Sequence, residues 1–420
     1  MQPHTQHLRA SLGRPSHLGR HAKSAGASSA VATRSHIVAS AERPREPTPE
    51  VSFVVTDTFV HEDFSVLSRH LRSREETPNE ITAVVRSPEL SLTFTGLSSG
   101  DILYFQHDVF GPPPTAAAAE RLRGHSGAVQ CLHFALNTQP EAFPGLSAAG
   151  TAAEDRDVGG QWLLSGSADR TIRIWSISGK HVECIRTIGG HGGTIVSLAL
   201  CMPYLISSST DGSLSFFVVD VSSRKEPTFS LVQKLQSGSA HTSTVKGMAV
   251  LAYSWFESVT AKWAGDKVRV CASSTDGWLF LLEGGGSGAV QEFAEFNAKG
   301  TRPPRWCREV FTIYRKMQVH SLCTRIVYAL PLESVVVTAG SDTGIAVVDP
   351  YLGEVWWKQA NPQGVSFSAL AWDAKQSLLL AGDDSGTLSY FNIYSKEIVA
   401  SQQISDHKIL HISVDMGKVF

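Results

Sequence analysis

The sequence has no uninterrupted apolar run as long as the roughly 18 residues that a membrane-spanning helix requires. Its six cysteines form no C-x-x-C pair and have no regular spacing, which excludes a disulfide framework and a zinc site as predictions; they are Cys131, Cys184, Cys201, Cys271, Cys307 and Cys323. A formal net charge of −2 gives no global field that would attract nucleic acid. We therefore expect a protein with reduced thiols, no membrane span, no metal and no nucleic-acid partner.

Motifs that hold cofactors or nucleotides are also missing. We find no P-loop, no G-x-G-x-x-G, no H-E-x-x-H and no calcium-loop pattern, so no cofactor is predicted. One segment, Gly96 to Gly100, matches the G-x-S-x-G of a nucleophile elbow, but such an elbow needs a helix after the serine. The residues that follow, "DILYFQ", alternate like a strand, so Ser98 is interpreted as a hairpin residue.

The first 41 residues lack acidic side chains. They contain five basic residues and many serines and alanines, and a Pro-rich stretch from Arg43 to Glu50 follows. This composition predicts a disordered basic tail over residues 1–50, ahead of a folded region over residues 51–420. A mitochondrial transit peptide has the same composition and stays open as the alternative.

A short pattern recurs along the folded region. Small residues lead into a polar tight turn, often Asp-Gly, and an alternating apolar strand follows; the copies are Gly96–Phe105, Gly166–Trp175, Ser208–Phe217, Ser273–Leu282, Ser341–Asp349 and Gly382–Phe391. Such turns between apolar runs are strong hairpin signals. The turn positions Arg170 and Gly212 are 42 residues apart, and a period of about 40 to 45 residues is typical of propeller blades with four strands. We predict an all-β propeller.

Longer intervals between copies are attributed to insertions. Residues 137–160 are rich in Ala, Gly and Pro and predict a mobile loop, and residues 298–317 are expected to separate the fourth blade from the fifth. The second insertion contains Arg302, Arg305, Trp306 and Arg308, a basic and aromatic set that is a candidate for partner binding. The alternative is a solvated connection whose aromatic side chains fold back on the rim.

Gly124-His125, "SGAVQCLHF" and then "LLSGSADRTIRIW" resemble the WD-repeat propeller signature, with Trp175-Ser176 where that family often has Trp-Asp. The resemblance implies a chain of hydrogen bonds through His125, Ser165, Asp169 and Trp175. Parts of it recur as His191, Ser207 and Asp211 in the third blade and as His241 and Asp276 in the fourth. No Gly-His pair precedes the fifth or sixth blade.

Ser165, His125 and Asp169 are also the residue types of a hydrolase triad. We expect the three residues to be held in a turn beneath a tryptophan, and the sequence indicates no donors for an oxyanion. They are therefore interpreted as structural. We therefore expect a protein that is not an enzyme, with a serine hydrolase as a remote alternative.

The number of blades is predicted to be seven. Six turns are legible, and Asp406 to Phe420 begins another unit, which the β-rich run Val51 to Val60 could complete and so remove open strand edges. The end at Phe420 also fits a truncated chain.

The resemblance to WD-repeat proteins implies a non-enzymatic, cytoplasmic scaffold that mediates protein–protein interactions in a multiprotein assembly. The alternative is a structural subunit of an organellar complex or of a ciliary or cytoskeletal one, with mitochondrial or ciliary localisation. The sequence identifies neither the partner proteins nor the oligomeric state.

Overall fold

The computed structural model describes residues 79–87, 90–106, 119–135, 161–179, 181–220, 227–236, 240–245, 248–286, 310–330, 335–415 and 418–419. The chain divides into two compact units, residues 1–52 and 53–420, and every described residue belongs to the second. The predicted tail over residues 1–50, the β-rich run Val51 to Val60 and the predicted loop over residues 137–160 lie outside the described residues.

The described residues form six four-stranded antiparallel sheets, each a meander in chain order, which we number as blades 1 to 6. Blade 1 contains β1 (Ile81–Ser87), β2 (Leu92–Leu97), β3 (Ile102–Gln106) and β4 (Glu120–Leu122). Blade 2 contains β5 (Val129–Ala135), β6 (Gln161–Ser167), β7 (Ile172–Ser178) and β8 (His181–Ile188). Blade 3 contains β9 (Ile195–Cys201), β10 (Tyr204–Ser209), β11 (Ser213–Asp220) and β12 (Thr228–Gln236).

The second half repeats this plan. Blade 4 contains β15 (Phe256–Ala264), β16 (Lys267–Ser274), β17 (Trp278–Gly284) and β18 (Phe311–Gln318). Blade 5 contains β19 (Thr324–Ala329), β20 (Val336–Gly340), β21 (Gly344–Asp349) and β22 (Glu354–Ala360). Blade 6 contains β23 (Phe367–Asp373), β24 (Leu378–Asp383), β25 (Thr387–Asn392) and β26 (Glu397–Gln403).

Each of the six predicted turns joins the second and third strands of a blade. The turn position has a positive φ, whether it holds glycine, as Gly212 does at 81°, or a larger residue, as Arg170 does at 68°. Glycine adopts this region without steric cost, whereas other residues need stabilising contacts. The turn chemistry therefore accounts for why six copies of one short pattern become six hairpins.

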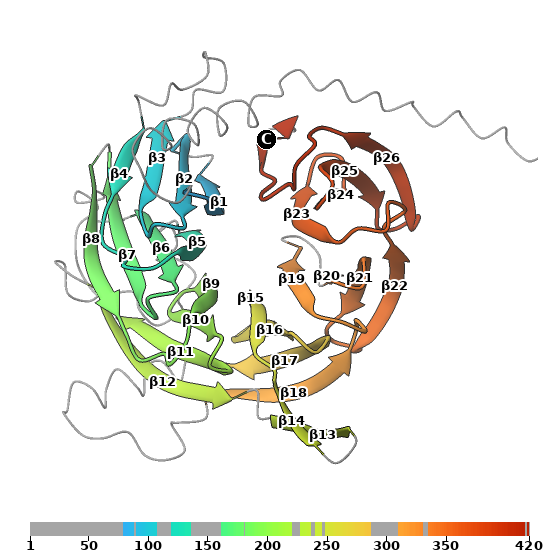
Figure 1. Cartoon of the computed structure of the whole chain (residues 1–420), viewed down its shortest axis with the longest axis horizontal. Coiled ribbons are helices and arrows are strands. Elements are labelled where there is room, and N and C mark those ends of the chain that lie inside the picture. Colours follow the sequence, from blue (N-terminus) through green and yellow to red (C-terminus); the bar gives the residue numbers. More distant parts are fainter. Residues whose placement is uncertain are drawn as a thin grey trace, which may run out of the picture. The chain divides into compact units, whose positions relative to one another are not determined.

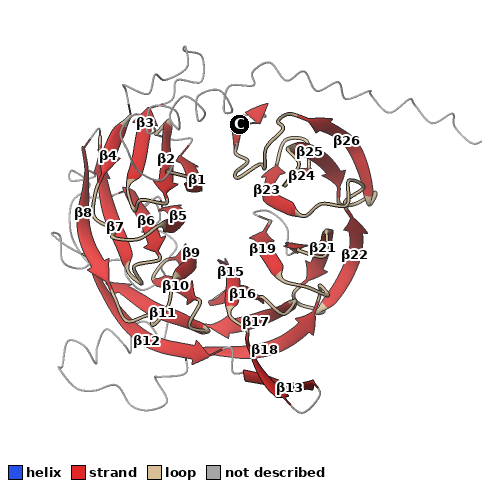
Figure 2. Cartoon of the chain, in the orientation of Figure 1, coloured by secondary structure: helices blue, strands red, loops and turns tan. Residues whose placement is uncertain are grey.

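The core lies between the sheets and not within one of them. Adjacent side chains on β6 show this: Leu163 belongs to the cluster between blades 1 and 2, Leu164 to the cluster between blades 2 and 3, and both are fully buried. Because both faces of a central strand are covered, its sequence contains consecutive apolar residues instead of alternating apolar and polar ones. Figures 1 and 2 show the six sheets following one another in chain order around a common axis, with β1, β5, β9, β15, β19 and β23 innermost.

The predicted number of blades was wrong for the described residues, which form six complete blades and not seven. After blade 6 the chain adds only the short pair β27 (Val414–Asp415) and β28 (Lys418–Val419). Ile409 nevertheless packs on Gly382 of blade 6, as Val129 packs on Gly96 and Ile195 on Gly166. The residues after blade 6 thus start like a new unit but form no four-stranded sheet.

Two further details differ from the sequence-based expectation. Residues 311–317, predicted to lie in a connection, belong to β18, where Phe311 is 1% exposed and stacks on Phe216 of blade 3 with ring centroids 4.4 Å apart. After Phe311 the residues of β18 are exposed apart from the half-buried Met317, so the strand lacks the alternating apolar pattern by which the other strands were predicted. In addition, β13 (Ala240–Val245) and β14 (Met248–Tyr253) form their own two-stranded sheet, and blade 4 begins only at β15.

Candidate functional site

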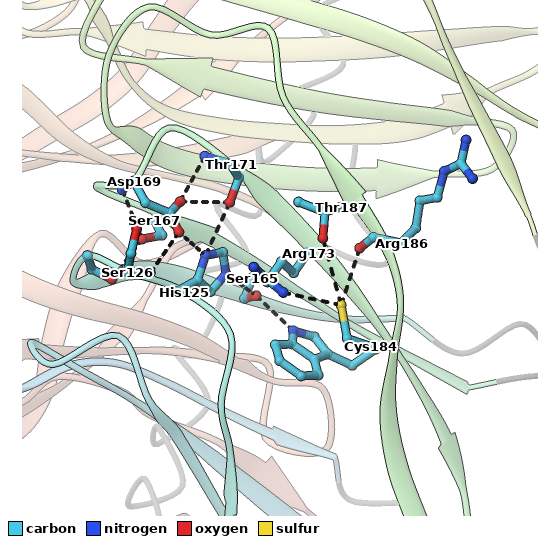
Figure 3. Close-up of polar contacts among 12 residues, drawn as sticks. His125, Ser126, Ser165, Ser167, Asp169, Thr171, Arg173, Cys184, Arg186 and Thr187 are labelled. Carbon is cyan, nitrogen blue, oxygen red and sulfur yellow. Dashed lines mark hydrogen bonds and ion pairs between the residues drawn. The ribbon is translucent and has the colours of Figure 1, made fainter.

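Four side chains of blade 2 form one continuous hydrogen-bonded chain (Figure 3). The indole Nε1 of Trp175 lies 2.9 Å from Ser165 Oγ, and Ser165 Oγ lies 2.8 Å from His125 Nε2. On the other side of the imidazole, His125 Nδ1 lies 2.8 Å from Asp169 Oδ2. His125 comes from the segment before β5, Ser165 from β6, Asp169 from the β6–β7 turn and Trp175 from β7. The hydrogen bonds therefore join the β6–β7 hairpin to the segment that precedes β5.

The donors and acceptors fix the direction of this chain. An indole N–H can only donate, so Ser165 Oγ accepts from Trp175, and its hydroxyl donates to Nε2 of a neutral His125, whose Nδ1–H is then donated to Asp169. Burial lowers the pKa of His125, although Asp169 acts in the opposite direction. Burial alone would raise the pKa of Asp169, but hydrogen bonds from Thr171, His125 and the Ser126 amide together lower it to about 2. Asp169 is therefore ionised and His125 neutral at pH 7.

Ser165, His125 and Asp169 make the contacts of a catalytic triad, but their burial prevents a substrate from reaching the serine hydroxyl. Ser165 is 0% exposed and His125 7% exposed, so a substrate carbonyl cannot approach the hydroxyl. Nucleophilic attack would also require Ser165 to face a free reaction volume, and its oxygen already accepts from the indole. Asp169 additionally accepts from the backbone amides of Ser126 and Thr171, at 3.1 and 2.9 Å. The arrangement satisfies buried donors at the turn, each of which would cost about 1–3 kcal/mol if left unpaired.

Blade 3 repeats the arrangement with two differences. His191 Nε2 lies 2.7 Å from Ser207 Oγ, but His191 Nδ1 lies 3.0 Å from Ser213 Oγ rather than on the carboxylate. Asp211 joins through Ser213, whose amide and hydroxyl it accepts, and through the Gly192 amide at 2.7 Å. Burial lowers the pKa of His191 to about 4. Phe217 occupies the register of Trp175 and has no donor, so the chain ends at Ser207.

Blade 5 contains a third copy that the sequence analysis missed. His320 Nδ1 lies 2.7 Å from Asp342 Oδ1, and its Nε2 lies 2.9 Å from Thr338 Oγ1. Lys358 adds an ion pair of 2.7 Å to Asp342. The residue before this histidine is Val319 rather than glycine, which is why a search for Gly-His overlooked it. A usable signal was present, because His320 precedes the β-branched Thr324 by four residues, as His125 precedes Val129 and His191 precedes Ile195.

The other two predicted positions lie apart in the fold. His241 lies on β13, whereas Asp276 lies in the β16–β17 turn of blade 4, so their backbones belong to different sheets. Asp276 accepts a hydrogen bond from Ser274 Oγ. Blade 6 has a different polar contact near its turn: Asn361 Nδ2 donates to Asp383 Oδ2 at 2.9 Å, and Asp383 is fully buried.

The candidates for partner binding cannot be placed. Arg302, Arg305, Trp306 and Arg308 lie outside the described residues. Within the described ranges, no group of three or more His, Cys, Asp or Glu residues is arranged to hold a metal ion. Across that same part of the chain, no helix is long and apolar enough to cross a membrane.

Comparison with known proteins agrees with this geometry. The family described as "WD domain, G-beta repeat" matches residues 156–176 and 182–217, which include β6, β9 and β10 and most of β7, β8 and β11. The chain is 26% identical over 165 residues to the mouse (Mus musculus) F-box/WD repeat-containing protein 10, covering 37% of this chain and 13% of that protein. It is 27% identical over 169 residues to human (Homo sapiens) F-box and WD repeat domain containing protein 10B, covering 37% and 19%.

A third relative matches a shorter segment more closely. The Lissencephaly-1 homolog of Branchiostoma floridae is 40% identical over 70 residues, which cover 17% of this chain and 16% of that protein. The matched segments thus span less than a fifth of each of these three relatives.

Proposed function

We propose that this chain, which belongs to the WD-repeat β-propeller family, is a non-enzymatic scaffold that holds partner proteins together in a multiprotein assembly. WD-repeat proteins generally bind other proteins, and rigid sheets with variable loops and rims suit that role. Fold alone does not determine function, so the proposal depends on what the residues of this chain do.

The proposal rests on the way in which the serine or threonine, histidine and aspartate side chains of blades 2, 3 and 5 are hydrogen-bonded. The Ser–His–Asp set of blade 2 is buried and bonded to a tryptophan and to turn amides, and related sets occur in blades 3 and 5. A group repeated in three blades stabilises a repeated turn, because a catalytic site would need one such group beside an open volume. What remains available for function is the surface of the blades.

Proximity labelling in cells with the full chain tests this proposal. A scaffold is expected to label a discrete and reproducible set of neighbours, and a variant in which residues 298–309 are replaced by a Gly-Ser linker shows whether the segment with Arg302 and Trp306 recruits any of them. The replacement stops at residue 309 because Phe311 begins β18 of the core. Labelling no different from that of a freely diffusing control protein would contradict the proposal.

A second candidate is a subunit of an organellar or ciliary complex. The acid-free basic composition of residues 1–41 favours it, because this is the composition of targeting segments. Fluorescent tagging of the full chain, compared with a chain that lacks residues 1–45, distinguishes the two. The scaffold proposal in its cytoplasmic form predicts the same diffuse distribution for both chains, whereas loss of an organellar signal on truncation would favour the alternative.

A further inference from the structure

One hairpin of the chain lies outside the six blades. The strands β13 (Ala240–Val245) and β14 (Met248–Tyr253) pair with each other, and no other described strand joins their sheet. Figure 1 shows this pair outside the ring of six sheets. It falls between β12 of blade 3 and β15 of blade 4, so the four-stranded plan of the blades does not use it. An isolated two-stranded sheet is only marginally stable in water, and further strands or a covering surface stabilise it.

Each strand of this hairpin has a free edge within the described part of the chain. Because β13 and β14 pair on one side only, the N–H and C=O groups on the other side of each strand have no strand partner there. Such a row of groups is a template for pairing with another strand. The hairpin pairs without a register shift from Ala240 opposite Tyr253 to Val245 opposite Met248, so each edge is an unbroken run of six residues.

The outer edges of the six blades are built differently. In blades 2 to 6 the outer strand has a β-bulge at the same register, and the bulge leaves Tyr314 unpaired in blade 4 and Trp356 unpaired in blade 5. Blade 1 ends on β4, which has only three residues. Each of these six outer strands also contains at least one Asp, Glu, Lys or Arg residue. Bulges, charges and short edge strands all hinder the pairing of one sheet edge with another.

The hairpin has none of these protective features. Neither "AHTSTV" of β13 nor "MAVLAY" of β14 contains Asp, Glu, Lys, Arg, Pro or Gly, and the ladder between the two strands has no bulge. The two edges differ in polarity, because β13 has one His, two Thr and one Ser, whereas β14 has only apolar residues and one Tyr. The edge of β14 is therefore the one that gains more from pairing with another apolar strand.

The sequence of β14 matches a second copy of itself. In any antiparallel register of two β14 strands, the residues that stand opposite one another are Met, Ala, Val, Leu or Tyr, so no like charges meet. An uncharged edge offers no charge complementarity to an acidic or basic segment of another protein. Antiparallel pairing of identical strands has a two-fold axis and gives a closed dimer. The resulting sheet has four strands, in the order β13-β14-β14-β13, with the more polar strands outermost.

We propose that two copies of this chain associate by antiparallel pairing of β14 with β14 of the second copy. Such a dimer presents every partner-binding surface of the propeller twice, which strengthens the binding of a partner that has two binding segments. The inference does not depend on the scaffold proposal, because the hairpins would pair whatever the propeller binds.

Sedimentation velocity of the purified full chain over a range of concentrations tests the inference. The wild type is expected to pass from 45.4 kDa to about twice that mass as the concentration rises. Hydrogen exchange gives a second measure of the same contact. The backbone amides of residues 248–253 should become better protected as the dimer forms, whereas protection of the six blades should not change.

The variant Leu251→Lys changes the edge itself. Leu251 lies near the middle of β14, so the two ammonium groups that it introduces would lie close to the two-fold axis, on neighbouring strands about 4.8 Å apart. Like charges at this separation disfavour pairing, and the dimer should dissociate at least about tenfold more readily than the wild-type dimer.

The matched control is Thr242→Lys, because Thr242 is the cross-strand partner of Leu251 on β13. The ammonium groups that it introduces would be three strand spacings apart in the dimer, about 14 Å, which exceeds the Debye length of about 8 Å at physiological ionic strength. Its dimer should therefore weaken by less than about twofold. Both variants should keep the wild-type melting temperature, because no strand of the six blades pairs with the hairpin.

Four results would overturn the inference. A chain that stays at 45.4 kDa at every concentration forms no dimer, and a dimer that Leu251→Lys weakens no more than Thr242→Lys uses another surface. Growth beyond the dimer would contradict a closed two-fold contact. Protection of residues 248–253 that is the same at every concentration would show that the edge is covered within one chain. None of these results bears on the scaffold proposal, which proximity labelling decides separately.

Discussion

The Trp175 indole donates to Ser165 Oγ across 2.9 Å, and this bond makes the most reactive-looking serine of the chain a buried acceptor. Ser165 in turn joins the indole of β7 to His125, which precedes β5. The polar chain therefore stabilises the packing of β6, β7 and the segment before β5 around one tight turn, and its members are expected to affect stability more than any chemistry.

Replacing Trp175 separates its packing from its hydrogen bond. Trp175 is 3% exposed, so Trp175→Ala should lower the free energy of unfolding by roughly 3–5 kcal/mol. Trp175→Phe keeps a ring, as Phe217 and Phe391 do in blades 3 and 6, and should cost about 1 kcal/mol for the lost donor. Urea denaturation measures both. Trp356→Ala, at a 42% exposed site, is the control and should change stability by less than about 0.5 kcal/mol.

Ser165→Ala tests the remote hydrolase alternative. The buried hydroxyl is expected to give no labelling with a fluorophosphonate probe in the wild type, while the substitution lowers the free energy of unfolding by about 1–3 kcal/mol because Trp175 Nε1 loses its acceptor. Wild-type labelling that disappears in Ser165→Ala would show instead that the serine is a nucleophile.

Asp342→Ala tests the unexpected copy in blade 5. The carboxylate accepts from His320 at 2.7 Å and from the Ser321 amide at 3.1 Å, and it pairs with Lys358. Its removal should destabilise the chain by about 1.5–3 kcal/mol, as loss of a charged hydrogen-bond partner does. Asp266→Ala, in the exposed β15–β16 turn, is the control and should leave stability unchanged. Thermal melts of both variants and of the wild type measure the difference. Equal melting temperatures for the two variants would argue against the blade 5 network.

Acidification should destabilise the fold through its buried histidines. Burial lowers the pKa of His191 from 6.5 to about 4, so below pH 6.5 the unfolded chain takes up a proton that the folded chain does not. Stability present above pH 6.5 is then lost as the pH falls toward 4, by up to about 1.4 kcal/mol per pH unit for each such histidine. His191→Gln should make this slope shallower between those pH values, and His181→Gln, with a side chain 75% exposed, should not.

Glycine at the blade 6 turn should resist substitution. Gly386 has a φ of 87°, and an added Cβ would lie 2.0 Å from the Ser405 carbonyl oxygen. Gly364 has a φ of 68° but nothing within 4 Å of such a Cβ. Gly364→Ala should cost about 1–2 kcal/mol for the backbone conformation alone, and Gly386→Ala distinctly more, because the next segment must also move. Similar losses in chemical denaturation would contradict a close approach at Gly386.

The sequence predicted an all-β propeller and its hairpins because their signals are local: a turn that needs positive φ, flanked by alternating apolar residues. The predicted blade count failed because six complete turns and a seventh beginning, at Ile409, do not determine how many sheets are completed. His320 was missed because the search required a glycine before it, whereas the structure requires only the four-residue spacing to the inner strand.

The contact between Arg269 and Tyr351 was beyond sequence analysis for a different reason. Arg269 and Tyr351 are 82 residues apart in the chain, and only the packing of blade 4 against the β21–β22 turn places one over the other. The bulges that expose Tyr314 and Trp356 likewise depend on strand register, which composition does not reveal.

The most direct test of the scaffold proposal is the native size and composition of the complex that contains the full chain in a gentle cell extract. Size-exclusion chromatography followed by mass spectrometry of each fraction should find the 45.4 kDa chain far above its own mass, with the same partner proteins in constant proportion across the peak. Elution at 45.4 kDa, or in particles that contain only copies of this chain, would contradict the proposal.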